Sequence, residues 1–188
     1  MIPYTVDRRP DTGVTNVTMG VWLLLASEVM LFGALFSSYA LLRTAALDWP
    51  SGRSVLNLPI GTANTAVLAA VTALVWRARM RAPASLRWWL GGSTMLSVGF
   101  LILKSWEYST EIAAGVRPST STFFAMYFTL TGLHALHVVI GAAANVWAIA
   151  GAARVPPALT RGRIHGLSLY WMFVDVVWVL ILGLLYLS

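Results

Sequence analysis

The chain has 188 residues, of which 58% are hydrophobic and 11% are charged, and its mean hydropathy is +0.73, so lipid rather than a soluble core must cover its apolar surface. The absence of cysteine excludes disulfides, iron–sulfur clusters, copper sites built on thiolates and thiol catalysis. The net charge of +6 does not indicate nucleic-acid binding, because the arginines lie in short loops between apolar runs.

Five apolar stretches are long enough to cross a bilayer, given that about 20 apolar residues span its hydrocarbon core. In chain order they cover approximately residues 19–42, 58–76, 86–106, 122–151 and 166–187. We therefore predict an all-α integral membrane protein in which five transmembrane helices form one bundle, as a single domain over residues 1–188. The first stretch is too long for a cleavable signal peptide and is expected to be the first membrane helix.

The loop charges predict the orientation of this bundle. One side carries Arg8, Arg9, Arg77, Arg79, Arg81, Arg87, Arg154, Arg161 and Arg163. The other side carries Arg43, Arg53, Lys104 and Arg117. Since positive charge concentrates on the cytoplasmic side, we expect the N-terminus in the cytoplasm and the C-terminus outside.

Two acids stand near the middle of predicted helices. Glu28, within the run WLLLASEVMLFGALF, and Asp175 each follow the cytoplasmic start of their helix by about ten residues, which corresponds to a depth of roughly 15 Å. His134 and His137 are three residues apart, share one face of the antiparallel fourth helix and also fall near its middle. We therefore predict a carboxylate–imidazole contact between the first and fourth helices.

The buried polar residues, to which Asn64 also belongs, have several interpretations. They can hydrogen-bond helices into register, relay protons, or contact lipid. A haem site is disfavoured, because His134 and His137 lie on one helix and haem needs axial ligands on opposite sides of the ring. His165 is placed at a loop edge as an interfacial residue. The sequence assigns no catalytic, cofactor-binding or metal-binding residue.

Small residues recur every seven positions on the first helix and cluster on the fourth. On the first helix the two sets are Gly20, Ser27 and Ala34, and Ala26, Gly33 and Ala40. On the fourth helix the cluster is residues 141–144. Because small side chains let helix backbones approach closely, these positions are expected to form helix–helix contacts.

Five segments, in order along nearly the whole chain, resemble subunit III of haem–copper oxidases. They are LLLASEVMLFGALFSSY (23–39), DWPSGRSVLNLPIGTANTAVLAA (48–70), WEYSTEIAAG (106–115), TGLHALHVVIG (131–141) and YWMFVDVVWVLILGLLYL (170–187). Longer members have two more N-terminal helices, so this sequence is expected to be the compact five-helix bacterial form. It departs from the family pattern at Met172, where His is usual, and at His165, where many members carry Glu.

The resemblance implies a subunit without a redox centre, in the inner membrane of a bacterium. Its partners would be subunit I, which holds the haems and copper and pumps protons, together with subunit II and other membrane subunits. The chain would stabilise subunit I, bind structural phospholipid and support proton uptake. Glu28, His134, His137, Asp175 and Asn64 are then candidates for structural or proton-supply roles. Lipid or interface candidates are Glu107, Tyr108, Trp171 and His165.

Three alternatives remain open. One is an accessory subunit of a nitric oxide reductase, whose membrane proteins resemble subunit III. Another is a small proton-coupled transporter, although the sequence shows neither an inverted repeat nor paired broken helices. The third is a freestanding haem enzyme. The electron donor of an oxidase, cytochrome c or quinol, is not determined by this chain.

Overall fold

The computed structural model describes residues 7, 9–80 and 85–187, and these residues form helices and no strands. The membrane-length helices are α1 (Asn16–Ala45), α3 (Leu58–Met80), α4 (Leu86–Ala113), α5 (Thr122–Gly151) and α6 (Pro157–Ile181). A π-helical turn, η2 (Leu182–Tyr186), continues α6. The short helix α2 (Gly52–Val55) lies between α1 and α3. The structure thus confirms the predicted all-α class with five helices long and apolar enough to cross a membrane.

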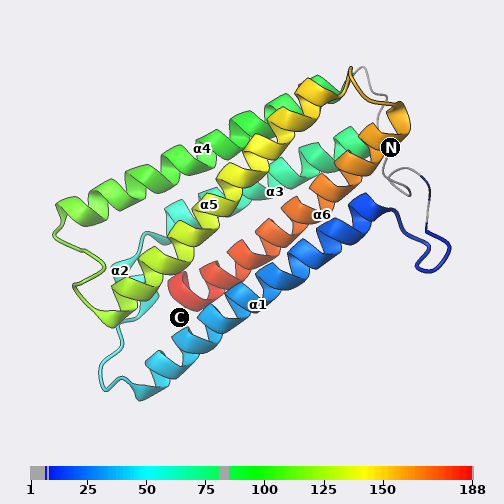
Figure 1. Cartoon of the computed structure of the whole chain (residues 1–188). Coiled ribbons are helices and arrows are strands. Elements are labelled where there is room, and N and C mark those ends of the chain that lie inside the picture. The colour runs from blue at the N-terminus through cyan, green and yellow to red at the C-terminus, as the bar shows by residue number, and fades with distance from the viewer. Residues whose placement is uncertain (1–6, 8, 81–84, 188) are drawn as a thin grey trace.

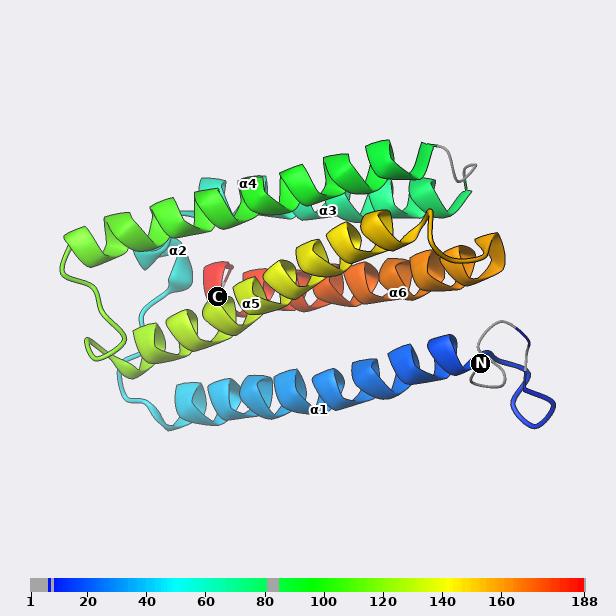
Figure 2. The ribbon, with the colours of Figure 1, turned by 45° about the horizontal axis from the view of Figure 1, so that its top comes forward.

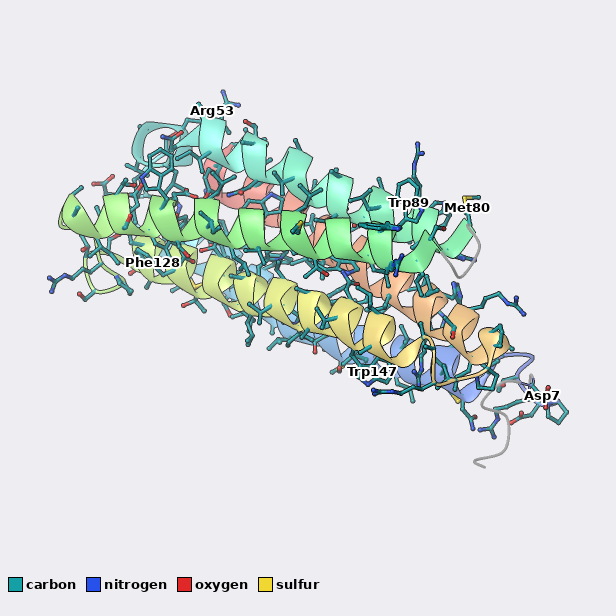
Figure 3. The ribbon with its side chains drawn as sticks, turned by 90° about the horizontal axis from the view of Figure 1, so that it is seen from above. Asp7, Arg53, Met80, Trp89, Phe128 and Trp147 are labelled. Carbon is teal, nitrogen blue, oxygen red and sulfur yellow. The ribbon has the colours of Figure 1, made fainter. Side chains whose placement is uncertain are left out.

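Four of the long helices form a bundle and the fifth flanks it (Figures 1 and 2). Around the bundle, α3 packs on α4, α4 on α5, α5 on α6 and α6 on α3, while α1 contacts only α6 and α5 extensively. The view from above distinguishes the two ends of the bundle (Figure 3). Trp147, Trp89 and Met80 lie toward the end of the bundle where the N-terminal segment lies, and Arg53 lies toward the opposite end. Helix α6 is therefore the central element, touched by three others.

Helix α1 uses large residues to contact the bundle. Its buried residues are Leu25, Phe32 and Tyr39, spaced by seven, which places them on one helix face. The small residues expected to form helix–helix contacts are exposed, and an added Cβ at Gly20 or Gly33 would meet no atom within 4 Å. The expectation of close backbone approach is therefore wrong for α1 within this chain, because the small residues point away from α5 and α6.

Local signals account for the helix ends. The side chains of Thr15 and Ser121 accept hydrogen bonds of 3.3 Å from the backbone N–H groups of Thr18 and Phe124, which caps α1 and α5. Helix α6 begins at Pro157, earlier than its apolar run, because proline is well suited to the first turn of a helix. Gly115, with φ of +84°, follows α4 in the left-handed conformation that lets the chain turn away.

The turn η2 joins several elements at the end of the bundle where α1 ends. The hydroxyl of Tyr39 in α1 donates a hydrogen bond of 2.6 Å to the carbonyl oxygen of Leu184. Gly52 of α2 lies so close to the carbonyl of Leu185 that a Cβ at this position would overlap it. The glycine is therefore required for the close approach of α2 to η2.

Candidate functional site

Glu28 and His137 form the predicted contact between the first and fourth membrane helices, α1 and α5. Glu28 Oε2 lies 2.9 Å from His137 Nε2, and the two side chains are 18% and 8% exposed. His137 Nδ1 lies 2.8 Å from the carbonyl oxygen of Leu133. Phe32 packs edge-on against the imidazole, with ring centroids 5.1 Å apart.

The carbonyl of Leu133 determines which ring nitrogen of His137 is available to Glu28. A carbonyl oxygen can only accept, so His137 Nδ1 carries a hydrogen. The Nε2 atom then either accepts a hydrogen bond from a neutral Glu28 carboxyl group or, as part of an imidazolium, donates one to a carboxylate. Both forms contain the same number of protons, so the pair can shift one proton between its partners without exchanging any with its surroundings.

A second polar cluster lies inside the bundle, at the end where α1 ends. Lys104 Nζ lies 2.9 Å from Glu107 Oε2, 2.7 Å from the Tyr186 hydroxyl and 3.1 Å from the Tyr127 hydroxyl. Both tyrosine hydroxyls also donate to Glu107 Oε1, at 3.0 Å from Tyr127 and 2.6 Å from Tyr186. The ammonium group lies 4.6 to 5.7 Å from the ring centroids of Tyr127, Tyr108, Tyr186 and Trp178. The ion pair is thus enclosed by aromatic rings.

Of the lipid or interface candidates, three lie largely within the bundle. Glu107 is fully buried in the cluster just described. The Tyr108 hydroxyl is 2.5 Å from Thr131 Oγ1. Trp171 is buried, and its Nε1 donates a hydrogen bond of 3.2 Å to Asn145, whose amide donates to Ser93 at 3.0 Å. The structure therefore assigns each of these side chains a contact within the chain.

The remaining candidates are dispersed. Asp175 is half-buried on α6, and its Oδ1 atom has no hydrogen-bond partner among the described residues. His165 is also half-buried, near the start of α6. His134 and Asn64 are completely buried, on α5 and α3. Only Glu28 and His137 among the structural or proton-supply candidates are therefore joined by a direct side-chain contact in the described part of the chain.

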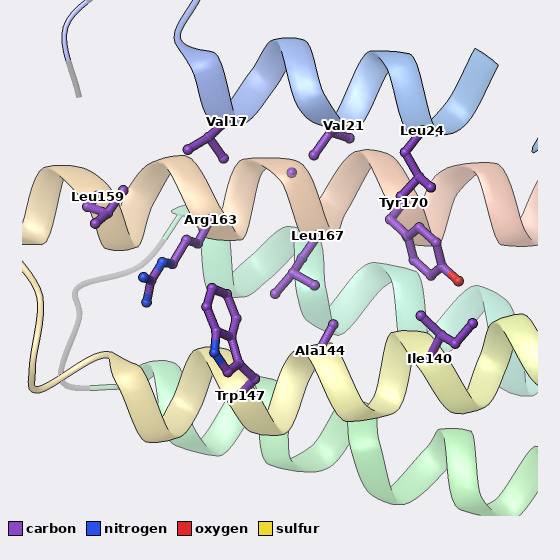
Figure 4. Close-up of a pocket in the computed structure, with 11 residues that line it drawn as sticks. Val17, Val21, Leu24, Ile140, Ala144, Trp147, Leu159, Arg163, Leu167 and Tyr170 are labelled. Atoms are coloured by element: carbon purple, nitrogen blue, oxygen red, sulfur yellow. The ribbon is translucent and has the colours of Figure 1, made fainter. Parts of the chain in front are cut away.

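An apolar cavity of about 380 Å³ lies between α1, α5 and α6, toward the end where α1 begins (Figure 4). Val17 and Val21 of α1 line one side, and Ile140 and Trp147 of α5 line the other. Arg163 of α6 is its charged residue, and the guanidinium carbon lies 4.2 Å from the centroid of the Trp147 ring. The cavity combines a long apolar surface with a cation at one end.

Sequence reasoning did not foresee this cavity or the ion pair. The loop-charge pattern assigns Lys104 to the outer side, whereas the structure buries it within α4, where it is 2% exposed. The spacing of Lys104 and Glu107, three residues apart on one helix, is the signal by which the pair is recognisable. For the cavity, the signal was weaker, because Arg163 appears in the sequence only as one of several loop-proximal arginines.

Within the described residues, no group of three or more His, Asp or Glu side chains is arranged to hold a metal ion. The polar clusters instead consist of pairs and chains of hydrogen bonds between helices. Their chemistry is therefore that of proton sharing, helix attachment and ion pairing.

Comparisons with known proteins agree with this architecture. The family model of cytochrome c oxidase subunit III matches residues 11–188. The cytochrome bo(3) ubiquinol oxidase subunit 3 of Pseudomonas aeruginosa is 32% identical over 192 residues, covering 96% of this chain and 88% of the relative. The cytochrome c oxidase subunit 3 of Bacillus sp. strain PS3 is 29% identical over 193 residues, covering 98% and 92%.

A third relative is a longer protein. The haem–copper oxidase subunit I+III of Aeropyrum pernix is 29% identical to this chain over 186 residues, which cover 92% of this chain and 23% of the relative. The match to the family model extends across all five membrane helices, and the chain belongs to the cytochrome c oxidase subunit III family.

Proposed function

We propose that this chain packs directly against subunit I of a bacterial haem–copper oxidase and stabilises it, without a redox group of its own. The observation that carries this proposal is the Aeropyrum relative, whose name places subunits I and III in one protein. Two functions joined in one polypeptide are expected to work side by side. Haems and copper then belong to the partner subunits, and subunit II completes the assembly.

The electron donor stays open between quinol and cytochrome c, because the relatives include subunits of both oxidase types. The three relatives described above are all named as oxidase subunits, so they do not favour the nitric oxide reductase, transporter or haem-enzyme alternatives. We place the chain in the cytoplasmic membrane with the start of α1 on the cytoplasmic side.

For the Glu28–His137 pair we propose a role in proton supply to subunit I. The pair lies at the boundary between α1 and α5, and Glu28 is partly exposed on the surface of the chain. It holds a proton that can move between carboxyl and imidazole. A group of this kind within a membrane commonly marks a proton path.

The test is the turnover lifetime of the intact oxidase carrying Glu28→Gln. The amide of Gln can donate a hydrogen bond to His137 Nε2, so the helices stay attached and assembly is unchanged, but it cannot release a proton. We expect activity to be lost faster during turnover. Ser27→Ala, at an adjacent exposed position on α1, is the matched control. A lifetime equal to that of the wild type would reject a role in proton supply.

We propose further that the cavity between α1, α5 and α6 binds an acyl chain of a phospholipid. Its walls are apolar, and Arg163 offers a guanidinium for the phosphate group near the end where α1 begins (Figure 4). Arginine suits this position because its planar group matches the geometry of phosphate oxygens.

Native mass spectrometry of the purified complex tests this site. Arg163→Gln removes the cation and is expected to reduce the amount of anionic phospholipid retained by the subunit. Arg161→Gln is the control, because Arg161 is an exposed arginine on the same helix that does not line the cavity. Equal lipid retention in the two variants would show that Arg163 does not hold a phosphate.

A further inference from the structure

One side of α6 stays exposed although α1, α3 and α5 all pack on this helix. Met172, Val176 and Val179 are 47%, 55% and 54% exposed. Their spacing of three and four residues places them on one face of the helix. We call these three residues the open face of α6.

The open face lies between the contacts that α6 makes with α1 and with α3. On one flank, Phe173 packs against Phe32 of α1, with ring centroids 6.2 Å apart. On the other flank, Trp178 Nε1 donates a hydrogen bond of 2.9 Å to Thr65 of α3. A further helix that covered the open face would therefore lie against α6 between α1 and α3.

Asp175 borders the open face on the side of α3. It follows Met172 by three residues and precedes Val179 by four, so the three side chains are neighbours on the helix surface. Asp175 is half-buried, and its Oδ1 atom is buried without a hydrogen-bond partner among the described residues. Its polar neighbour is Thr72 of α3, whose hydroxyl oxygen also lacks a partner there.

Thr72 cannot satisfy the whole carboxyl group of Asp175. A threonine hydroxyl has one hydrogen to donate, so rotation of this group serves one carboxyl oxygen and leaves the other. A polar group at membrane depth must face a partner, because hydrocarbon offers it no hydrogen bond. The remaining oxygen of Asp175 therefore requires a partner from outside the chain.

The depth of Asp175 limits what this partner can be. The residue lies near the middle of the apolar run at residues 166–187, roughly 15 Å from either end at the rise of an α-helix. Phospholipid headgroups lie at the ends of such a run, and acyl chains carry no hydrogen-bond donor. A polar side chain on a transmembrane helix of another subunit can reach this depth.

We propose that a transmembrane helix of subunit I docks on the open face of α6 and hydrogen-bonds to Asp175 through a polar side chain. This inference rests on the proposed function, in which subunit I is the direct neighbour because the Aeropyrum relative joins subunits I and III in one protein. Hydrogen bonds between helices and close apolar packing both drive the association of membrane helices. Asp175 supplies the first and the open face supplies the second.

The first test identifies the neighbour of the open face in the intact complex. The photo-crosslinking residue p-benzoylphenylalanine replaces either Val176 or Met95, which is 78% exposed on α4. Met95 is the control, because it lies near the middle of the apolar run at residues 86–106 on a helix that packs on α3 and α5. After membranes are irradiated, we expect an adduct with subunit I from position 176 and not from position 95.

The other outcomes separate this inference from the proposed function. If subunit I co-purifies with the chain but forms no adduct at position 176, the proposed function stands and the docking site is wrong. An adduct at position 176 with a second copy of this chain, with another subunit or with lipid alone would also overturn the docking site. If subunit I does not co-purify, the proposed function itself fails.

The second test examines the contribution of Asp175. Asp175→Leu removes the carboxyl group, whereas Asp175→Asn keeps a side chain that donates and accepts hydrogen bonds. We expect Asp175→Leu to lower the fraction of the subunit that co-purifies with tagged subunit I, and Asp175→Asn to retain most of it. Equal co-purification of the wild type and Asp175→Leu would show that Asp175 does not hold the partner.

Thr72→Val is the matched control, since it removes the polar neighbour within the chain and leaves Asp175 in place. The amount of each variant in the membrane before solubilisation distinguishes a loss of folding from a loss of docking. We expect wild-type amounts of all variants, with reduced co-purification for Asp175→Leu alone. Equal losses from the membrane for Thr72→Val and Asp175→Leu would instead show that the carboxyl group is satisfied within the chain, which would overturn the proposed hydrogen bond.

Discussion

The ammonium group of Lys104 lies 2.9 Å from Glu107 and is surrounded by aromatic side chains from α4, α5, α6 and η2. A charge in a membrane bundle is tolerated where it has an opposite charge and hydrogen bonds, as here. The pair therefore ties the final turn of the chain to α4 and α5. Its stabilising effect depends on both charges being present.

We predict that Lys104→Met destabilises the subunit more than the double change Lys104→Met with Glu107→Leu. Removing only the lysine leaves Glu107 as a buried, uncompensated carboxylate, which costs roughly 3–5 kcal/mol in comparable pairs. The measurement is the temperature at which the subunit dissociates from the purified complex. If the double variant were less stable than the single variant, the ion pair would not be the source of the loss.

The candidate site was predictable to different degrees at different residues. The contact of Glu28 with His137 followed from their similar depth in antiparallel helices, which sequence position alone provides. The surroundings of Lys104 were not predictable, because Tyr127 and Tyr186 come from two other helices and their rotation about each helix axis is set by packing. The burial of Trp171 was not predictable either, because it depends on a space at the surface of α5, a helix other than its own.

That space is provided by a glycine. A Cβ on Gly141 of α5 would lie 2.7 Å from Cζ2 of Trp171, closer than real contacts allow. The indole therefore sits directly against the backbone of α5. This contact holds α6 to α5 and orients Trp171 toward Asn145.

At the level of helices, substitutions of Gly33 in α1 and Gly141 in α5 are expected to behave differently. Gly141→Leu should destabilise the subunit itself, because Trp171 must move and lose its hydrogen bond. Gly33→Leu should leave the subunit folded, since no atom of another helix lies within 4 Å of its Cβ position, but it should lower the yield of complex by blocking a partner at α1.

Limited proteolysis of the isolated subunit and the yield of purified complex separate these two effects. Ala34→Leu, on another exposed position of α1, shows whether the effect of Gly33→Leu is confined to one face. A normal yield with Gly33→Leu would indicate that lipid rather than a partner helix covers this face.

The helices themselves were largely predictable because membrane spans require long apolar runs, and all five are present. Their ends were less predictable. Helix α4 continues to Ala113, past the predicted end at residue 106, because its polar last turns are paired through Lys104, Glu107 and Tyr108. The face of α1 was mispredicted, because a seven-residue spacing of small residues does not show which side meets the bundle.

On the scale of the whole molecule, cations concentrate at the end where α1 begins. Of the arginines assigned to that side, Arg8 and Arg81 lie outside the described residues. Four of the others lie over tryptophan rings, with guanidinium carbons 4.2 to 5.8 Å from the ring centroids: Arg77, Arg79, Arg87 and Arg163. Since Lys104 is buried in an ion pair, only Arg43, Arg53 and Arg117 remain on the opposite side. This asymmetry supports a cytoplasmic N-terminal side.

The absence of native cysteine allows a direct test of orientation. We predict that Leu47→Cys, in the exposed connection between α1 and α2, reacts with a membrane-impermeant maleimide added to spheroplasts. Thr12→Cys, exposed before α1, should react only after the membrane is permeabilised. The wild-type subunit provides the unlabelled background. The reverse labelling pattern would place the N-terminal side outside the cell.

The position of η2 in the chain has a consequence for biogenesis. The carbonyl of Leu184, which accepts a hydrogen bond from Tyr39, and the hydroxyl of Tyr186, which donates to Glu107, both lie in η2 after α6. These two contacts can therefore form only after the fifth span has been inserted. Before that step, Glu107 lacks one of its two tyrosine donors, and the first helix is not yet fastened at this end. Completion of the end of the subunit that contains η2 is therefore expected to be among the last events of its synthesis, after the arginine-bearing ends of the earlier helices have already been positioned.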